Sequence, residues 1–219
     1  MSPVRHAVIT AAGIGSRLGL NLPKCLVPVG GKRVIDYQLA LLKDVEDLRI
    51  VVGFHRDLVI EHVKATRPDA VFVCNHQYAN TTTLQSLYLG TKGLQLPFVS
   101  VDGDVIFQPE SFRKFLQMCG ETMPLTAISP AASTDAIYAE VDSEGTILKG
   151  LTRVSGSPWE WPGLSYLCPS MIQDNPTFIY QQIEKFLPMK VCQIKCWEID
   201  TPQDLVRADE AIRRGFLVS

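Results

Sequence analysis

The sequence predicts an α/β fold of three layers, in which helices cover both faces of a mostly parallel sheet. From residue 6 to residue 120, short apolar runs alternate with amphipathic stretches in the order strand, helix, strand, helix. The run at residues 6–11 is apolar almost throughout, as strands of buried parallel sheets are. After about residue 123 the pattern changes to alternating apolar and polar residues, which predicts a small antiparallel lobe over one end of the sheet.

Local signals justify each element of the first half. Ile35, Leu39 and Leu42 recur at the spacing of one helix face. Pro109 near its start and Gly120 after its end mark the fourth helix. In chain order, the predicted elements are a strand at 6–11, a helix at 34–43, a strand at 48–53, a helix at 56–67, a strand at 70–74, a helix at 81–94, a strand within 97–107 and a helix at 109–120.

The second half begins with a predicted hairpin over residues 136–154, whose turn is at 143–145. Residues 156–163 hold two tryptophans among prolines and glycines, which predicts a turn-rich loop. A helix is expected over 175–188 and a strand over 191–199.

The end of that strand and the last helix carry two further signals. Cys192 and Cys196 fall on one face of a strand, which favours buried thiols over a metal pair. Thr201 suits the N-cap of the last helix, Pro202 its first position and Asp204 the capping box.

Composition excludes several classes of protein. The net charge of −2 gives no basic field for nucleic acid. No apolar run approaches the roughly 18 residues of a membrane span, and the first ten residues lack the apolar core of a signal peptide. A soluble, cytoplasmic protein of one domain is therefore expected, and the sequence leaves a homodimer open.

The stretch AAGIGSRLGLNLPK, residues 11–24, has the glycines of a phosphate-binding loop but fits neither common glycine-loop pattern. It lacks the G-x4-G-K-[ST] run of a P-loop. Gly13 and Gly15 begin a dinucleotide fingerprint, but Leu18 stands where the third glycine belongs. Asp36, at the distance of a ribose-binding acid, falls in the pattern of a helix instead.

The same loop still favours an anion. Its small residues leave backbone N–H groups open to close approach, and a helix start after it would add a positive dipole. Arg17 offers a forked donor and Lys24 a compact positive charge. The alternative is an ordinary glycine turn with surface cations.

Aspartates stand at two other predicted strand ends. Asp102 and Asp104 flank a glycine after the fourth strand, and Asp200 directly precedes the last helix. Ligands of open α/β sheets bind beyond the carboxyl ends of the strands, where the glycine loop also lies. Carboxylates beside a bound polyphosphate suit Mg²⁺, which keeps phosphate and water ligands. Each feature alone is weak, but three converging on one sheet edge indicate a site.

These residues resemble those of the nucleotidyltransferases that activate sugar phosphates and small phosphate esters, enzymes with a Rossmann-like sheet. The shared motifs are A-A-G-x-G-S-R-L…P-K, the G-D after the fourth strand and E-I-D-T-P-x-D near residue 200. Within that family the chain is most similar to the short cytidylyltransferases that act on phosphocholine and on alkylphosphonates such as 2-aminoethylphosphonate. The stretch YANTTTLQSLYL at 78–89 supports that branch.

The resemblance implies a nucleotide-binding part at 1–122, an acceptor-binding lobe at 123–196, and a last part at 197–219 that supplies a metal ligand and the final helix. It also implies a Mg²⁺-dependent transfer of CMP from CTP, with Lys24 and Arg17 as the catalytic cations. The metal ligands would be Asp104 and Asp200. The nucleotide would contact Ala11, Ala12, Gly13, Gly15, Ser16, Arg17, Thr82, Ser86 and Asp102.

An anionic phosphate or phosphonate oxygen would be the nucleophile in such a reaction, so no general base is required. The four histidines, at positions 6, 55, 62 and 76, are accordingly interpreted as structural or surface residues. Relatives in this family often carry asparagines where Thr82 and Thr83 stand, which leaves the base preference open.

The loop that contains Trp159, Glu160 and Trp161 is predicted to bind the acceptor. Two indoles beside a carboxylate suit a cationic head group, and Asp135 and Tyr180 are further candidates for the same wall. The alternative is that the tryptophans cover a core edge or form a dimer contact. The phosphocholine enzymes carry a tryptophan where this chain has an isoleucine at 137, which favours a smaller amine than choline.

Three other functions stay open on the sequence. The first is a sugar-1-phosphate nucleotidyltransferase that uses another NTP. The second is a nucleotide-binding regulatory protein without catalysis, which the combination of Arg17, Lys24, Asp104 and Asp200 disfavours. The third is a molybdopterin-type nucleotidyl carrier, which rests on the glycine loop alone.

Overall fold

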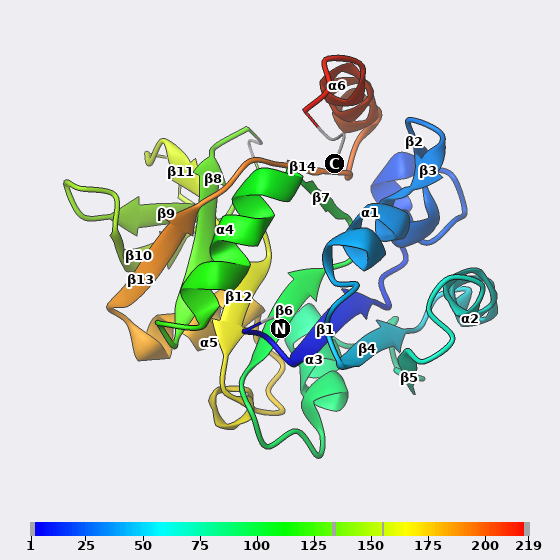
Figure 1. The fold of residues 1–219 in the computed structure, drawn as a ribbon, viewed down its shortest axis with the longest axis horizontal. Coiled ribbons are helices and arrows are strands. Elements are labelled where there is room, and N and C mark those ends of the chain that lie inside the picture. The colour runs from blue at the N-terminus through cyan, green and yellow to red at the C-terminus, as the bar shows by residue number, and fades with distance from the viewer. Residues whose placement is uncertain (1–2, 133–134, 155, 217–219) are drawn as a thin grey trace.

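The structure is a computed structural model that describes residues 3–132, 135–154 and 156–216. Most of its strands form one ten-stranded sheet (Figure 1). These strands are β1 (His6–Ala11), β4 (Asp47–Val52), β5 (Val71–Cys74), β6 (Phe98–Asp102), β8 (Leu125–Pro130), β9 (Tyr138–Val141), β10 (Ile147–Thr152), β11 (Trp159–Glu160), β12 (Leu164–Leu167) and β13 (Met189–Gln193). Their order across the sheet is β11-β9-β10-β13-β8-β12-β6-β1-β4-β5.

The half of the sheet formed by β6, β1, β4 and β5 is parallel throughout, as the alternation of strands and helices predicts. From β1 the chain passes to β4 on one side and later returns to β6 on the other. The loop after β1 therefore begins at a switch point of the topology, where α/β sheets bind ligands.

The other half is mixed and continues the same sheet, so the antiparallel lobe is not a separate layer. β12 joins it to the parallel half by pairing antiparallel to both β6 and β8. The predicted hairpin is confirmed as β9 and β10. The loop predicted over 156–163 includes a short strand, β11, which pairs with β8 and β9.

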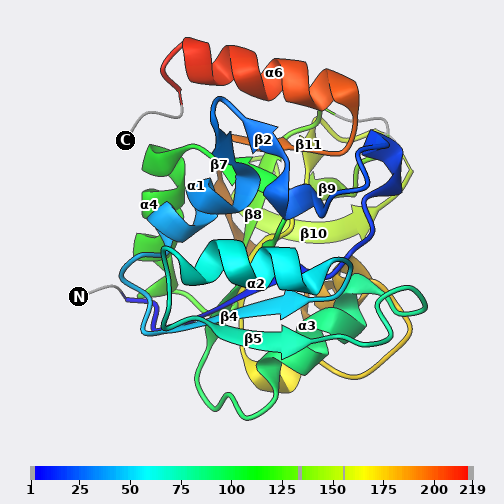
Figure 2. The same ribbon diagram turned by 90° about the vertical axis from the view of Figure 1, so that its right-hand side faces the viewer.

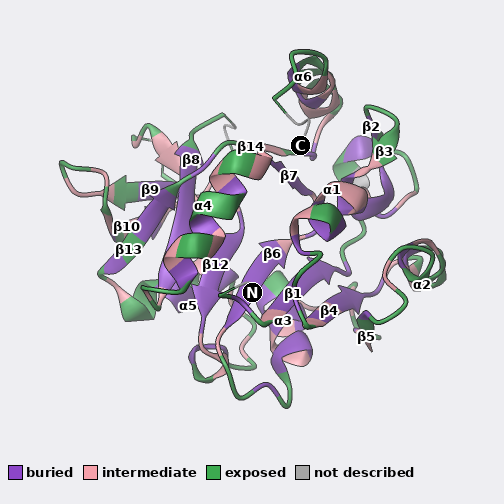
Figure 3. Cartoon of the chain, viewed as in Figure 1, coloured by how far each residue is buried: buried purple, intermediate pink, exposed green. Residues whose placement is uncertain are grey.

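Helices cover both faces of the sheet, which confirms the three-layer prediction. Figure 2 shows α1 and α2 on one side of β4 and β5, and α3 on the other. The side chains of β1 alternate between the two faces: Ile9 packs in one buried cluster and Val8 in the other. Figure 3 shows that the buried positions follow the strands and the inner sides of the helices. The helices are α1 (Val34–Leu41), α2 (Arg56–Lys64), α3 (Thr83–Thr91), α4 (Pro109–Cys119), α5 (Ile179–Ile183) and α6 (Pro202–Arg213).

Two short sheets stand apart from the large one. β2 (Pro28–Val29) pairs with β3 (Lys32–Arg33) beneath α6, and β7 (Val105–Phe107) pairs antiparallel with β14 (Cys196–Glu198). The prediction of one strand over 191–199 is therefore wrong, because the chain leaves β8 after Ile194 and crosses to β7. Cys192 is buried in β13, whereas Cys196 is half-buried in β14.

The capping predicted for the last helix is confirmed. Thr201 is the N-cap of α6, and its hydroxyl accepts a hydrogen bond from the backbone N–H of Asp204. The Asp204 carboxylate accepts in return from the Thr201 backbone N–H at 2.7 Å. This capping box fixes where α6 begins, directly after Asp200.

Gly90 lets α3 lie close against the sheet. A Cβ atom at this position would lie 2.5 Å from Cγ1 of Val8 and 2.8 Å from Cγ2 of Val51, and both valines are fully buried. We expect Gly90→Ala to destabilise the fold by about 1–3 kcal/mol, because the valines have no free space to move into. At about 2–4 °C per kcal/mol, calorimetry should show a melting temperature several degrees lower. An unchanged melting temperature would mean that α3 is free to shift.

Candidate functional site

A cavity of about 210 Å³ opens at the carboxyl ends of β1 and β6. One wall is the glycine loop, the second is the segment that leads into α3, and the third is the end of β6. Most of the predicted nucleotide contacts line this cavity, namely Ala11, Ala12, Gly13, Gly15, Thr82, Ser86 and Asp102. The predicted catalytic Lys24 and the predicted metal ligand Asp104 line it too, whereas Arg17 and Asp200 line a neighbouring cavity. The side chain of Ser16 lies outside the described part of the structure.

The two glycines of the loop have different roles. At Gly13, an added Cβ would meet no atom within 4 Å, so the backbone there is open to a ligand. Gly15 has φ +64°, and a Cβ would lie 2.7 Å from Cγ of Lys24. Glycine at 15 therefore lets the loop fold over the lysine stem, which directs the ammonium group toward the strand ends.

Lys24 connects two aspartates that are far apart in sequence. Its Nζ lies 2.8 Å from Oδ2 of Asp104 and 2.5 Å from Oδ1 of Asp200. Burial alone would lower the pKa of this lysine, but the two carboxylates outweigh that effect and raise it. Lys24 is therefore a permanent positive charge at the floor of the site.

The pairing of β7 with β14 brings these aspartates together. Val105 lies opposite Glu198 in the register, and the backbone N–H of Ile199 donates to the carbonyl of Asp104 at 2.8 Å. Asp104 stands directly before β7, and Asp200 is the second residue after β14. The sequence prediction placed Asp200 at the end of a strand in the parallel sheet, whereas β14 belongs to the small separate sheet.

Arg17 makes ion pairs with two carboxylates. Its guanidinium contacts Asp200, and Nη1 lies 3.0 Å from Oδ2 of Asp135. Arg153 also approaches Asp135, at 3.4 Å. The glycine loop is thus joined to the antiparallel lobe through Arg17 and Asp135.

Two other carboxyl groups near the strand ends have raised pKa values. Burial, together with the charge of Asp104, raises the pKa of Asp102 to about 7, although the Thr10 hydroxyl donates to it at 2.9 Å. Burial of its carboxyl group and the charges of Asp104, Asp200 and Asp102 raise the pKa of Glu198 to about 8 against the opposing charge of Lys24, although the residue as a whole is exposed. Each of these pKa values is raised partly by neighbouring carboxylates, so a cation bound among them would favour their ionised forms.

The two carboxylates that face Lys24 are suitable ligands for Mg²⁺. Within residues 3–132, 135–154 and 156–216, no three His, Cys, Asp or Glu side chains gather into a metal site of their own. Asp104 and Asp200 nevertheless present two carboxylates to one cation, the Lys24 ammonium. Mg²⁺ is commonly held by one or two carboxylates plus phosphate oxygens and water. Asp104 and Asp200 supply that number of carboxylates.

The wall that leads into α3 is held by an asparagine that the sequence reading missed. Asn75 follows β5, is 3% exposed, and donates hydrogen bonds to the hydroxyls of Thr81 and Ser86. Thr82 is the N-cap of α3, with Gln85 completing the capping box. A polar residue directly after a predicted strand, at the sheet edge where the glycine loop lies, is the signal that indicates Asn75.

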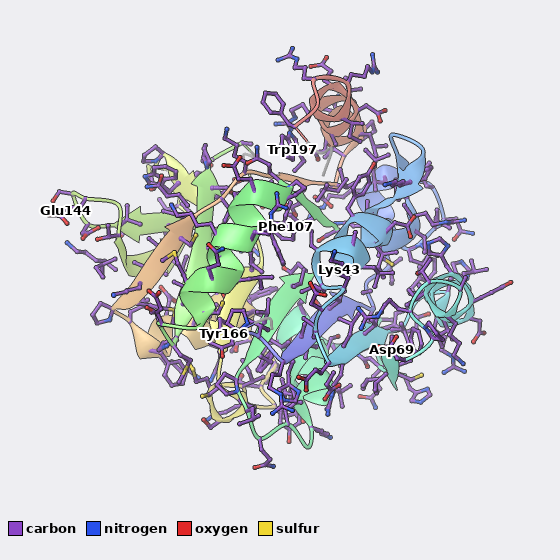
Figure 4. All side chains as sticks on the ribbon, viewed as in Figure 1. Lys43, Asp69, Phe107, Glu144, Tyr166 and Trp197 are labelled. Atoms are coloured by element: carbon purple, nitrogen blue, oxygen red, sulfur yellow. The ribbon has the colours of Figure 1, made fainter. Side chains whose placement is uncertain are left out.

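A second cavity of about 270 Å³ lies on the far side of Arg17. Of the predicted acceptor residues, Asp135 and Glu160 line it, and Trp197, which the sequence reading did not select, also lies there. Figure 4 places Trp197 beneath α6. The charged lining residues are five acids, Asp135, Glu160, Glu198, Asp200 and Asp204, and two arginines, Arg17 and Arg207.

The other predicted acceptor residues lie elsewhere. Trp159 lines grooves on either side of β11 rather than this cavity. Trp161 donates from Nε1 to the Ser165 hydroxyl at 3.1 Å and packs on the core. Tyr180 stacks on Phe178, and both rings lie beneath the guanidinium of Arg153. The structure therefore brings Asp135 and Glu160 to the site, but not these three aromatic side chains.

Residues 7–157 match the MobA-like NTP transferase domain. The chain is 30% identical over 152 residues to the CMP-5'-(3-aminopropyl)phosphonate synthase of Streptomyces rubellomurinus, a match that covers 66% of this chain and 24% of that protein. It is 35% identical over 115 residues to the choline-phosphate cytidylyltransferase of Streptococcus pneumoniae, covering 50% of this chain and 49% of that protein. These matches span a quarter to a half of the length of the two relatives.

Solved structures share the fold. The CTP:phosphocholine cytidylyltransferase from Streptococcus pneumoniae superposes with a TM-score of 0.78 at 24% identity, covering 94% of this chain and 98% of that one. The inositol-1-phosphate CTP transferase from T. maritima gives a TM-score of 0.78 at 17% identity, covering 98% and 99%. The described residues form no helix long and apolar enough to cross a membrane.

Proposed function

The chain belongs to the MobA-like NTP transferase domain family, and on that premise we propose that it transfers CMP from CTP to a small acceptor bearing a phosphate or phosphonate group. The observation that carries this proposal is the position of Lys24. Its ammonium group pairs with both Asp104 and Asp200, next to the glycine loop. A loop that opens its backbone to an anion, next to a fixed cation and two carboxylates, suits cleavage of a polyphosphate bound with a metal ion.

In the proposed reaction, an acceptor oxygen attacks the α-phosphorus of CTP in line. A new oxygen–phosphorus bond forms, the bond to the bridging oxygen breaks, and pyrophosphate leaves with the electron pair. The acceptor oxygen is already anionic near neutral pH, so no proton has to be removed. None of the four histidines lines the 210 Å³ cavity: His6 pairs with Asp47, and His62 pairs with Asp36.

The chain's own residues position and neutralise charge in this scheme. Lys24 faces the α-phosphoryl group, and Arg17 leaves its carboxylate partners to hold phosphate oxygens in a fork. Asp104 and Asp200 would hold Mg²⁺, which supplies further charge neutralisation when bound.

The acidic cavity beyond Arg17 supports an acceptor with a positive charge. Glu198, whose pKa is raised to about 8, is mostly protonated near neutral pH. The other four acids against two arginines still leave an excess of negative charge there, and Trp197 adds an aromatic face. Two relatives carry names that include an aminopropylphosphonate and choline phosphate. We therefore propose an amine- or ammonium-bearing phosphate or phosphonate as acceptor.

Glu160 tests the charge of this cavity. Glu160→Gln keeps the shape of the side chain and an oxygen that accepts from the backbone N–H of Ala132, which the carboxylate now does at 3.1 Å. We expect the KM for 2-aminoethylphosphonate to rise about threefold to tenfold, because one partly buried attraction worth about 1 kcal/mol is lost. The KM for CTP should change less than about twofold.

Methylphosphonate, which lacks the amine, serves as the comparison acceptor, and its KM should not rise in the Glu160→Gln variant. Glu144→Gln, in the turn of the β9–β10 hairpin, is the matched control for loss of one carboxylate. An equal rise for both acceptors would show that Glu160 does not recognise a positive charge.

A pyrophosphate-release assay tests the function as a whole. Four NTPs are crossed with phosphocholine, 2-aminoethylphosphonate, phosphoethanolamine and sugar-1-phosphates, each with and without Mg²⁺. We expect release with CTP and an amine-bearing acceptor, and only with Mg²⁺. Release with a sugar-1-phosphate and another NTP would replace this proposal, and no release with any pair would favour a binding protein without catalysis.

A further inference from the structure

A network of hydrogen bonds around Asn75 sets the direction of the Ser86 hydroxyl. The side-chain oxygen of Asn75 accepts from the backbone N–H of Gln77 at 3.0 Å. The amide nitrogen must therefore lie on the other side, where it donates to Oγ1 of Thr81 at 2.8 Å and to Oγ of Ser86 at 2.9 Å. An amide has two N–H hydrogens, so both donors of Asn75 are used and its orientation is fixed.

The two hydroxyls held by Asn75 differ in what they can still offer. Thr81 accepts from Asn75 and donates its own hydrogen to the carbonyl of Gln77 at 3.0 Å, so its hydroxyl is satisfied. Ser86 also accepts from Asn75, but within the described residues its hydroxyl hydrogen has no acceptor. Ser86 is 5% exposed and lines the 210 Å³ cavity. A buried hydroxyl hydrogen without a partner in a cavity wall is available for donation to a bound molecule.

The place of Ser86 in the fold identifies which part of the ligand it faces. Asp104 follows the end of β6 and pairs with Lys24 of the glycine loop, and these two residues mark the phosphate end of the cavity. Asn75 follows β5, and β1 and β4 stand between β6 and β5. The Asn75 network therefore holds the wall of the cavity that lies away from the cations, where a nucleotide held by its phosphates would place its base.

We propose that Asn75 is a positioning residue for nucleotide recognition: it holds Ser86 as a hydrogen-bond donor to an acceptor atom on the edge of the base. The inference rests on the proposed use of CTP and adds a residue that sets specificity without touching the nucleotide. A pyrimidine carbonyl or an unprotonated ring nitrogen is the kind of atom that such a donor fits.

Asn75→Asp is the direct test, because the variant keeps the size of the side chain but replaces two donors by an acceptor. The Ser86 hydroxyl then donates to the new carboxylate and turns away from the cavity. Calorimetry would compare the Kd for CTP with the Kd for ribose 5-triphosphate, which has the same phosphates and sugar but no base. The preference for CTP is the Kd for ribose 5-triphosphate divided by the Kd for CTP. We expect this ratio to fall about threefold to tenfold, as for loss of one hydrogen bond.

Ser86→Ala should reduce the preference by the same factor, and the double variant should reduce it no further, because both changes remove one donor. Thr81→Val also removes a partner of Asn75 but leaves Ser86 in place, so it should keep the preference. Melting temperatures of all variants without ligand separate loss of folding from loss of recognition, and Ser86→Ala provides the test if Asn75→Asp does not fold.

The outcomes distinguish this inference from the proposed function. An unchanged preference in Asn75→Asp, an additive double variant, or a wild-type protein without preference for CTP over ribose 5-triphosphate would overturn it. An equal loss for both ligands would place the donor against the ribose or phosphates and also overturn it. If the wild type binds CTP with this preference but releases no pyrophosphate with any acceptor, the proposed transfer fails and the role of Asn75 stands.

Discussion

Replacing Lys24 with alanine is expected to lower turnover at least about 10²-fold, which is the usual effect of losing one donor that acts in a transition state. The expectation follows from geometry, since the ammonium group lies within 2.8 Å of both Asp104 and Asp200 and beside the open backbone of the glycine loop. Among the residues that the structure describes, Lys24 is the one lysine that lines the 210 Å³ cavity. Turnover would be measured as pyrophosphate release at saturating CTP and acceptor.

The Lys24→Ala variant should keep its fold, because the core contacts of this turn come from the buried neighbours Cys25 and Leu26. Circular dichroism and a melting curve check this. Lys32→Ala removes the same charge from the nearby β3, where the ammonium lies 5.8 Å from the Tyr37 ring centroid, and should keep normal turnover. Near-normal turnover in Lys24→Ala would refute the assignment of this site.

Asp104→Asn and Asp200→Asn are each expected to lower Mg²⁺-dependent activity about 10³-fold. An amide oxygen keeps the shape of the ligand but loses its charge, and a bound cation contributes several kcal/mol to stabilising phosphoryl transfer. Activity would be measured across a Mg²⁺ titration, and higher Mg²⁺ should recover little of it.

Asp57→Asn is the control for these two variants, because its side chain on α2 is 92% exposed. It should have the activity and Mg²⁺ dependence of the wild type. Full activity in either Asp104→Asn or Asp200→Asn would show that the metal ion is held by other residues. Activity without added Mg²⁺ in the wild type, in the presence of a chelator, would exclude the metal requirement itself.

The parallel half of the fold could be predicted from the sequence because each of its elements carries a local signal. The strand expected at residues 6–11 is β1, and the helix expected at 109–120 is α4, which ends at Cys119. The glycine loop follows β1 directly, so the sequence predicts that its residues lie at the carboxyl ends of the parallel strands.

The strand order of the second half could not be predicted, because its strands pair with partners that are distant in sequence. β8 and β12 were not expected, although both lie inside the large sheet. The strand predicted over 191–199 keeps its alternation through Ile194 and Cys196 while changing from one sheet to another. A period of two residues reports the pleat of a strand and not its partner, so the sequence does not reveal such a crossing.

The cavity of about 270 Å³ beyond Arg17 shows the same limit for side chains. Asp135 and Glu160 reach it, but the neighbouring indoles of Trp159 and Trp161 do not. The contribution of Trp197 depends on β14 crossing to β7, a pairing of three residues with three. Asn75 could be recognised only once its partners Thr81 and Ser86 were seen around it.

The pairing of β7 with β14 affects the order in which the site can form while the chain is synthesised on the ribosome. Asp104 is synthesised first, and its partner Asp200 and the strand that places it are made almost a hundred residues later. The nascent chain can complete its parallel sheet early and still lack half of the carboxylates around Lys24. The proposed metal site is thus incomplete until the segment around residue 200 has left the exit tunnel and docked against β7.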